Sequence, residues 1–208
     1  MRISHTEFEM CRKNPREWVS KKTKNLIQIR MGYDGLTKRA IYMFHRTKSA
    51  AEAQAHLSRL LNKFNLKNTV LRDKAQEKLN SYIEWFNEES PAVSECGLRL
   101  DYDLGNGWVL GGEISRVDID IESGGYRGVL ISNRPPSWQQ QLRFPLIQRA
   151  LSARLQRPET LISVGFQNLI GTQLEVISFP KSRLDEVEAM AKELAKVLSG
   201  EWHRQKRI

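Results

Sequence analysis

The sequence contains little cysteine, and this scarcity excludes two classes of protein. Cys11 and Cys96 are the only cysteines among 208 residues. Two cysteines are too few for a disulfide-stabilised secreted domain, and they lack the CxxC spacing that is typical of zinc sites. The usage is typical of a reduced, intracellular protein, so we expect a cytoplasmic location.

Long apolar runs are also missing. No window approaches the roughly 18 consecutive apolar residues that a membrane span needs. The opening MRISHTEFEMCRK has no apolar run behind its basic residue and does not resemble a secretion signal. We therefore expect no membrane partner. A chain with 40% hydrophobic residues can bury one sizeable core, so residues 1–208 are expected to form a single domain.

Positive charge is concentrated in one segment. The formal net charge is +9, and between Arg12 and Lys48 eleven Lys or Arg residues stand against Glu17 and Asp34 alone. The rest of the chain has 22 basic and 22 acidic residues, so the whole surplus lies in this segment. A polyanion that binds such a segment releases counterions. We therefore expect nucleic acid as a partner, with DNA favoured, and a solvated lysine-rich surface is the alternative.

Hydrophobic periodicity predicts helices in the first part of the chain and strands after it. Long helices are expected over residues 49–64 and 70–86, and short ones over residues 6–11 and 16–21. Residues 25–44 contain the turn signal GYDG and are expected to be irregular or weakly helical. Alternating patterns separated by turn signals then predict a three-stranded meander made of CGLRLDYDL, WVLGGEISRVDIDI and YRGVLIS.

The last part of the chain is predicted to alternate helices and strands. Helices are expected over residues 137–156 and 182–198, with Gly200 ending the second. Between them, TLISVGFQNLIG and TQLEVISFP have strand patterns. This order predicts a mixed sheet with helices on its faces. A helical, basic part over about residues 1–90 precedes a sheet-containing core over about residues 91–200.

Four segments, in order, resemble the RecB-like branch of the PD-(D/E)XK nuclease superfamily. They are the opening ISHTEFEMCRKNPREW, the helix AEAQAHLSRLL, the hairpin GGEISRVDIDIESGGYRGVLISNR and the helix WQQQLRFPLIQRALSARL. In the second segment Ala53 and His56 take the places of the family's Gly-x-x-His element. The resemblance covers the chain as far as the strand at residues 160–169. It implies a restriction-endonuclease-like, three-layer α/β/α fold with a mixed central sheet and a helical N-terminal elaboration.

Cleavage in this family requires carboxylates that hold Mg²⁺ or Mn²⁺ and a lysine that orients or deprotonates the attacking water. The resemblance places Ser115 at the first acid, Ser132 at the second and Arg134 at the lysine. A register one residue earlier gives Ile131 and Asn133, which also lack the acid and the base. Serine is a poor magnesium ligand, and arginine stays protonated. We therefore expect no catalytic residue and no metal cofactor.

The iron–sulfur members of the family need four cysteines, one early and three late. Here Cys11 has no companions, Asn14 stands at the position of the knuckle cysteine, and the C-terminal tail has no cysteine. The resemblance therefore implies no iron–sulfur cluster.

A rearranged metal site is the first alternative. Glu113 shares a strand face with Ser115, and Glu95 and His56 could approach it, with a lysine supplied from elsewhere. Such a site would make the protein an active DNA nuclease that depends on Mg²⁺ or Mn²⁺. The same residues also have structural interpretations, with His56 as a half-buried hydrogen-bonded histidine and Glu113 as the ion-pair partner of a neighbouring arginine.

Other residues of the hairpin and the following helix are expected to have structural roles. Asp118 and Asp120 alternate onto the strand face opposite Ser115, so they are expected to be solvated. Trp138 is expected to anchor the core beneath the Pro-Pro turn. Gln148 either lies near a scissile phosphate, as the resemblance implies, or faces solvent.

The leading hypothesis is an inactive nuclease-fold protein that binds nucleic acid and works with protein partners in a defence, repair, recombination or mobile-element complex. A scaffold for protein partners, with exposed apolar faces on the helices at residues 49–64 and 182–198, is the second alternative. The expected phosphate contacts are Arg12, Lys13, Arg16, Lys21, Lys22, Lys24, Arg30, Lys38, Arg39, Arg116 and Arg134. The last two of these stand where metal ions would otherwise neutralise charge.

Overall fold

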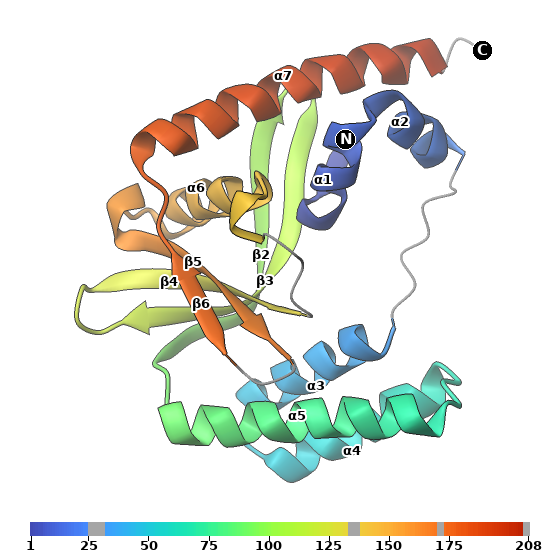
Figure 1. Cartoon of the computed structure of the whole chain (residues 1–208), viewed down its shortest axis with the longest axis vertical. Coiled ribbons are helices and arrows are strands. Elements are labelled where there is room, and N and C mark those ends of the chain that lie inside the picture. Colours follow the sequence, from blue (N-terminus) through green and yellow to red (C-terminus); the bar gives the residue numbers. More distant parts are fainter. Residues whose placement is uncertain (25–31, 133–137, 170–172, 206–208) are drawn as a thin grey trace.

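The computed structural model describes residues 1–24, 32–132, 138–169 and 173–205 (Figure 1). The helices in these ranges are α1 (His5–Lys13), α2 (Pro15–Thr23), α3 (Tyr33–Thr47), α4 (Ala50–Lys63), α5 (Thr69–Glu89), α6 (Arg143–Leu155) and α7 (Lys181–Gln205), with the short 3₁₀ helices η1 (Trp138–Gln140) and η2 (Glu159–Leu161). The strands are β1 (Arg2–Ser4), β2 (Val93–Gly105), β3 (Trp108–Asp120), β4 (Gly125–Ser132), β5 (Ile162–Asn168) and β6 (Leu174–Ile177).

The strands form one mixed sheet in the order β1-β3-β4-β5-β6, with β2 paired to β3. β2, β3 and β4 are antiparallel neighbours, which confirms the predicted meander. β4 and β5 run parallel, and β5 and β6 run antiparallel. Asn106 and Gly107 adopt left-handed backbone angles in the β2–β3 turn, as the GNG signal indicated.

The edge of β3 that faces away from β2 is shared by two other strands. β1 pairs in parallel with Val109 to Gly111, and β4 pairs antiparallel with Arg116 to Asp120. Because β2 occupies the opposite edge of β3 along most of its length, β1 and β4 must lie on the same edge. Residues 112–115 of β3 stand between them, and we call this opening between β1 and β4 the fork.

Helices cover both faces of the sheet, giving three layers (Figure 1). On one face α1, α2, α6 and α7 bury Phe8, Trp18 and Leu194 against the sheet. On the other face α3, α4 and α5 pack Phe44 and Leu57 together with residues of β4. The helical N-terminal part is therefore divided between the two faces. No helix in the described ranges is both long enough and apolar enough to cross a membrane.

Polar caps explain where the first helices begin. The Ser4 side chain accepts the amide of Glu7, and Glu7 bonds back to the Ser4 amide in a capping box. Asn14 ends α1 and caps α2, with Pro15 at the first helical position. Asn68 caps α5 in the same way. The helices predicted over residues 6–11 and 16–21 are confirmed in slightly longer form.

Two local predictions differ from the structure, and one strand was missed. Residues 33–44 were expected to be irregular or weakly helical and instead form a regular helix, because the GYDG signal lies at the start of α3 and Leu36 and Phe44 belong to one buried stripe. Gly200 does not end α7, since Trp202 beyond it still packs on the core. β1 was not predicted, because three residues carry no periodicity. Residues 25–31 lie outside the described ranges.

Candidate nucleic-acid interface

Ser115 stands at the position of the family's first acid, and its hydroxyl forms a hydrogen bond with the backbone. It is fully buried, and its hydroxyl accepts a hydrogen bond from the amide of Ile131 at 3.0 Å. This bond lies just beyond the last registered pair of β3 and β4, Arg116 with Val129. The hydroxyl therefore satisfies a buried backbone donor where the two strands diverge. Ser132, at the second acid position, is the half-buried last residue of β4.

Glu113 lies at the fork and acts on two side chains of α3. Burial lowers the pKa of Lys38, and the carboxylate of Glu113 opposes this effect. Burial raises the pKa of the Tyr42 phenol, and Glu113 raises it further. Lys38 and Tyr42 are four residues apart, so they share one face of α3. The sequence prediction left the source of a lysine open, and Lys38 supplies one beside Glu113.

His5 and Arg143 approach the fork from the opposite helical layer. A Cβ atom at Gly112 would lie 2.0 Å from Cδ2 of His5, so the imidazole packs directly over this glycine. Burial and the charges of Arg143 and Lys38 together lower the pKa of His5 to about 4, although a backbone hydrogen bond at Glu113 acts in the opposite direction. His5 is therefore neutral at pH 7. Lys38 and Arg143 both act on this imidazole, while Glu113 and Asp34 act on Lys38 and Glu9 acts on Arg143. The fork therefore gathers two cations with carboxylates close to them.

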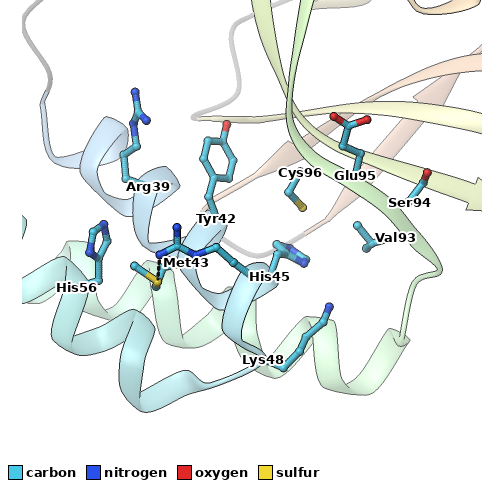
Figure 2. Close-up of a pocket in the computed structure, with 11 residues that line it drawn as sticks. Arg39, Tyr42, Met43, His45, Lys48, His56, Val93, Ser94, Glu95 and Cys96 are labelled. Carbon is cyan, nitrogen blue, oxygen red and sulfur yellow. Dashed lines mark hydrogen bonds between the residues drawn. The ribbon is translucent and has the colours of Figure 1, made fainter. Parts of the chain in front are cut away.

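The three residues proposed for a rearranged metal site are not gathered in one place. Within the described ranges, no three His, Cys, Asp or Glu side chains are arranged to hold a metal ion. Glu95 and His56 line a pocket between α3, α4 and β2 (Figure 2). Glu113 lies at the fork instead, and Tyr42 contributes to both places.

Arg116 forms a buried network rather than a surface contact. Its side chain is fully buried, and its Nε and Nη2 donate to the carboxylate of Asp118 at 2.6 and 2.9 Å. Its Nη1 donates to the Tyr82 hydroxyl at 2.6 Å and to Gln167 at 3.0 Å. The guanidinium also lies 4.7 Å from the ring of Trp85.

Two sequence predictions are therefore corrected. Arg116 cannot reach a phosphate from this position, because its guanidinium is enclosed by its own partners. Asp118 is 2% exposed rather than solvated. The strict alternation on which that prediction rested breaks at the fork, where Ile114 packs against α6 while Arg116 faces α5.

The other expected phosphate contacts are spread over α1, α2 and α3. Arg12, Lys13, Arg16, Lys21, Lys24 and Arg39 are exposed, whereas Lys22 and Lys38 are half-buried. Arg30 and Arg134 lie outside the described residues. Three of the α1 and α2 cations form ion pairs within the chain: Arg12 with Glu9, Lys21 with Glu17, and Lys22 with Glu7. The pairs of Arg12 and Lys21 are exposed and weak, so these cations can exchange their partners for a phosphate, whereas the Lys22 partner Glu7 is buried.

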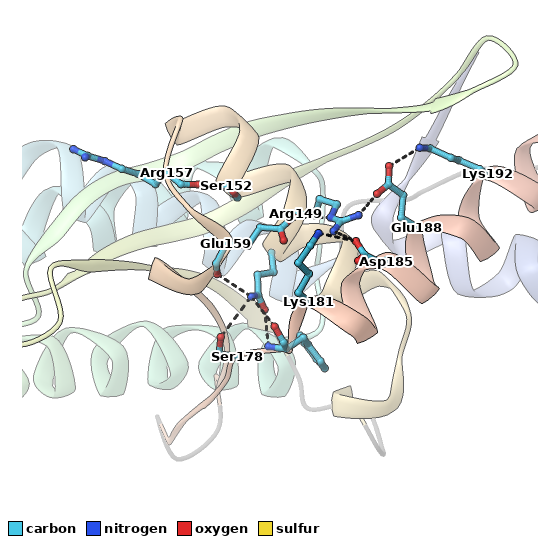
Figure 3. Close-up of polar contacts among 11 residues, drawn as sticks. Arg149, Ser152, Arg157, Glu159, Ser178, Lys181, Asp185, Glu188 and Lys192 are labelled. Atoms are coloured by element: carbon cyan, nitrogen blue, oxygen red, sulfur yellow. Dashed lines mark hydrogen bonds and ion pairs between the residues drawn. The ribbon is translucent and has the colours of Figure 1, made fainter.

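The glutamine-rich helix has a structural role at Gln148. This side chain is fully buried, accepts the Phe179 amide at 2.8 Å and donates to the Phe179 carbonyl at 3.2 Å. Neither a phosphate-facing nor a solvent-facing position is correct for it. Next to it, Arg149 joins α6 to α7 through Asp185 and Glu188 (Figure 3).

Trp138 is a core anchor, as predicted. It is 1% exposed, stacks on Phe166 with 5.8 Å between ring centroids, and donates its indole N–H to Glu175 at 2.8 Å.

Comparisons with known proteins support the fold and nothing finer. No protein-family model matches the chain, and no curated protein matches it. The crystal structure of a candidate exonuclease from Eubacterium rectale matches with a TM-score of 0.53 and 9% sequence identity, covering 87% of this chain and 73% of that chain. The structure of SSO0001 has a TM-score of 0.37 and 12% identity, with 86% and 82% covered. The mixed sheet between helical layers is thus a nuclease-like fold, consistent with the restriction-endonuclease-like class.

Proposed function

We propose that this chain is a nuclease-fold protein, related to the RecB-like branch, that binds nucleic acid without cleaving it, with DNA as the favoured ligand. The observation that carries the proposal is the state of Ser115. A serine stands where the resemblance requires a metal-binding acid, and its hydroxyl is bonded to the Ile131 amide. A metal ion would lose one of its principal ligands at this position.

Positive charge supports binding at the same place. Lys38 and Arg143 are close enough to affect His5, and the acids that act on them are Glu113 and Asp34 for Lys38 and Glu9 for Arg143. Lysine and arginine can hold a phosphate where metal ions are absent. The helices α2 and α3, which carry exposed cations, lie one above the other in Figure 1, in different helical layers. A nucleic-acid backbone that crosses the fork would therefore meet basic side chains from both helical layers.

A paired assay on the purified protein tests this function. Binding to labelled single- and double-stranded DNA is followed against salt, and cleavage is followed against added Mg²⁺ and Mn²⁺. We expect binding that weakens steeply with salt and no metal-dependent cleavage, because each neutralised phosphate releases counterions. Binding that does not respond to salt would contradict the proposal.

A charge-matched pair of variants locates the surface. The triple change Lys13→Gln, Arg16→Gln and Lys24→Gln removes three exposed cations that have no ion-pair partner among the described residues. We expect it to reduce the salt slope by roughly 1 for each phosphate that is no longer neutralised. The control removes the same number of charges around the connection between α4 and α5, by Lys63→Gln, Lys67→Gln and Lys74→Gln. Equal weakening by both triples would mean that net charge alone drives binding.

An active nuclease is the second candidate, because Lys38 lies close enough to Glu113 for the two charges to interact. A lysine whose pKa is lowered by burial is better suited to act as a base than an exposed one. If this candidate is correct, Mg²⁺- or Mn²⁺-dependent cleavage survives purification and is lost in both Glu113→Gln and Lys38→Met. Cleavage that persists in both variants comes from a contaminant.

Membership of a defence, repair, recombination or mobile-element complex rests on analogy between related folds. A purely scaffolding role has less support, because α4 and α7 turn apolar residues such as Leu57 and Leu198 into the core. Crosslinking in cells followed by mass spectrometry tests membership. Recovery of the chain without any nucleic-acid-processing partner would contradict it.

A further inference from the structure

A pocket of about 580 Å³ lies between α3, α4 and the start of β2 (Figure 2). Small-molecule sites commonly have volumes of about 300–1,000 Å³, so a nucleotide-sized group can enter. Tyr42 and Met43 come from α3, His56 from α4, and Val93 and Glu95 from β2. The pocket adjoins the fork at Tyr42 but is formed mainly by other residues.

The side chains that line this pocket carry more positive than negative charge. Arg39, Arg46 and Lys48 line it, and none of them forms an ion pair with a carboxylate of the described residues. Glu95 is the acidic residue among those that line the pocket. His56 is affected by the same positive charge, because burial and then the charges of Arg59, Arg46 and Arg39 lower its pKa. A concave surface with three such cations attracts an anion.

The wall of the pocket also contains a buried donor without an acceptor. Arg116 can only donate, so the Tyr82 hydroxyl accepts from it and donates its own hydrogen bond to Nε2 of His45, 2.7 Å away. Burial, with Arg116 and Lys48, lowers the pKa of His45 to about 3, so the ring is neutral at pH 7. A neutral imidazole that accepts at Nε2 carries its proton on Nδ1. Within the described residues, this buried Nδ1 has no hydrogen-bond partner.

The remaining polar groups of the pocket do not indicate covalent chemistry. Burial raises the pKa of the Cys96 thiol to about 12, so it is protonated and a weak nucleophile at neutral pH. The aromatic ring of Tyr42 and the thioether of Met43 instead offer surface to a flat, weakly polar group.

We propose that this pocket binds a phosphate monoester carried on a nucleotide-sized group, either a free nucleotide or the phosphorylated end of a strand. Arg39, Arg46 and Lys48 neutralise the phosphate, and the Nδ1–H of His45 donates to one of its oxygens. The base or sugar lies against Tyr42 and Met43. The inference stands on the pocket's own residues and does not require binding at the fork.

Calorimetric titration of the full chain with adenosine 5′-monophosphate, adenosine and inorganic phosphate tests the proposal. The monophosphate is expected to bind at least tenfold more tightly than adenosine, because only it carries the anion. Inorganic phosphate is expected to compete with it. Adenosine that binds as tightly as the monophosphate, or a monophosphate that gives no saturable heat, would overturn the proposal.

Substitutions of residues that line the pocket test whether the monophosphate binds there. Arg46→Gln combined with Lys48→Gln is expected to weaken monophosphate binding at least tenfold, and Lys67→Gln combined with Lys74→Gln to leave it unchanged. His45→Gln can still accept from Tyr82 but has no donor at the Nδ1 position, so a several-fold loss is expected. If the exposed double variant Arg46→Gln, Lys48→Gln binds as tightly as the natural chain, the pocket is not the site.

Oligonucleotides identify the source of the phosphate. A 5′- or 3′-phosphorylated strand that displaces the monophosphate, when the hydroxyl-ended strand does not, assigns the pocket to a strand end. Monophosphate binding that neither strand affects assigns it to a free nucleotide. Salt-sensitive binding of unphosphorylated duplex is expected to persist in Arg46→Gln, Lys48→Gln, so failure of this inference is distinguishable from failure of the proposed function.

Discussion

Arg116 and Arg39 were both expected to contact phosphates, yet the molecule uses them in opposite ways. Arg116 lies inside the sheet–helix interface and bonds to Asp118, Tyr82 and Gln167. Arg39 is exposed at the pocket and has no ion-pair partner among the described residues. Tyr82 and His45 join the two regions, since the buried network ends at a histidine in the pocket wall. A cation that already has its partners stabilises the fold, whereas one without partners is available to a ligand.

The largest expected effect is on the buried region. Arg116→Met leaves the carboxylate of Asp118 buried without its partner, so the free energy of unfolding should fall by about 3–5 kcal/mol. Urea denaturation measures this change. The double variant Arg116→Met, Asp118→Leu removes both charges and should recover much of the loss. A single variant as stable as the natural chain would show that the network contributes little.

A smaller loss of stability is expected at the fork. In Gly112→Ala the new Cβ atom would lie 2.0 Å from the half-buried ring of His5, and such overpacking typically costs about 1–3 kcal/mol. Gly111→Ala is the matched control, because the atoms that its Cβ meets belong to the end of the flexible, exposed Arg2 side chain. Equal losses in the two variants would mean that His5 is not fixed over β3.

Acid should destabilise the protein through His5 and His45. Their folded-state pKa values of about 4 and about 3 lie below the ordinary value of 6.5. Between each folded-state pKa and 6.5, the unfolded chain binds a proton that the folded chain does not. The free energy of unfolding therefore falls as pH drops below 6.5. The slope is at most about 1.4 kcal/mol per pH unit for each histidine. Thermal unfolding from pH 7 to pH 5 measures it, and His5→Gln, His45→Gln should flatten the curve.

The smallest effect is a change of pKa in the pocket. Burial lowers the pKa of His56, and Arg59 on α4 and then Arg46 and Arg39 on α3 lower it as well, while Glu95 lies across the pocket on β2. Sulfate bound among these cations should raise that pKa, because it neutralises their field. An NMR titration of His56 with and without sulfate tests this, and Arg46→Gln should raise the pKa without any ligand. A pKa that sulfate leaves unchanged would place the anion elsewhere.

Much of the architecture could be predicted from patterns within single elements. The helices at residues 49–64 and 70–86 and the three-stranded meander follow from hydrophobic periodicity, and the structure confirms them. Predictions based on local breakers were less reliable. The GYDG signal and Gly200 both lie in helices, because Leu36 on one and Trp202 on the other gain enough burial to override the local preference.

The site was harder to predict, because its geometry depends on pairing between distant strands. Strict alternation along β3 placed Asp118 on the face opposite Ser115. The alternation of side chains between the two faces is interrupted at the fork. Glu95 and His56 were allowed to approach Glu113 in a rearranged metal site, but both line the pocket, whereas Glu113 lies at the fork. Lys38 was expected to contact phosphate, and its position beside Glu113 was missed. Its four-residue spacing from Tyr42 was the available signal, once α3 is recognised as a helix.

The pairing of β1 with β3 has a consequence for how the protein is made. Arg2 is registered with Val109, and α2 packs against α7, so the first helices emerge from the ribosome long before their partners. At typical synthesis rates of about 5–20 residues per second, α1 and α2 wait roughly 10–40 s for the C-terminal helix. The layer with α3, α4 and α5 is built from neighbours in sequence and can form earlier. During synthesis the pocket is therefore expected to take shape before the fork closes, and chaperones would meet the apolar side of α1 and α2 in the interval.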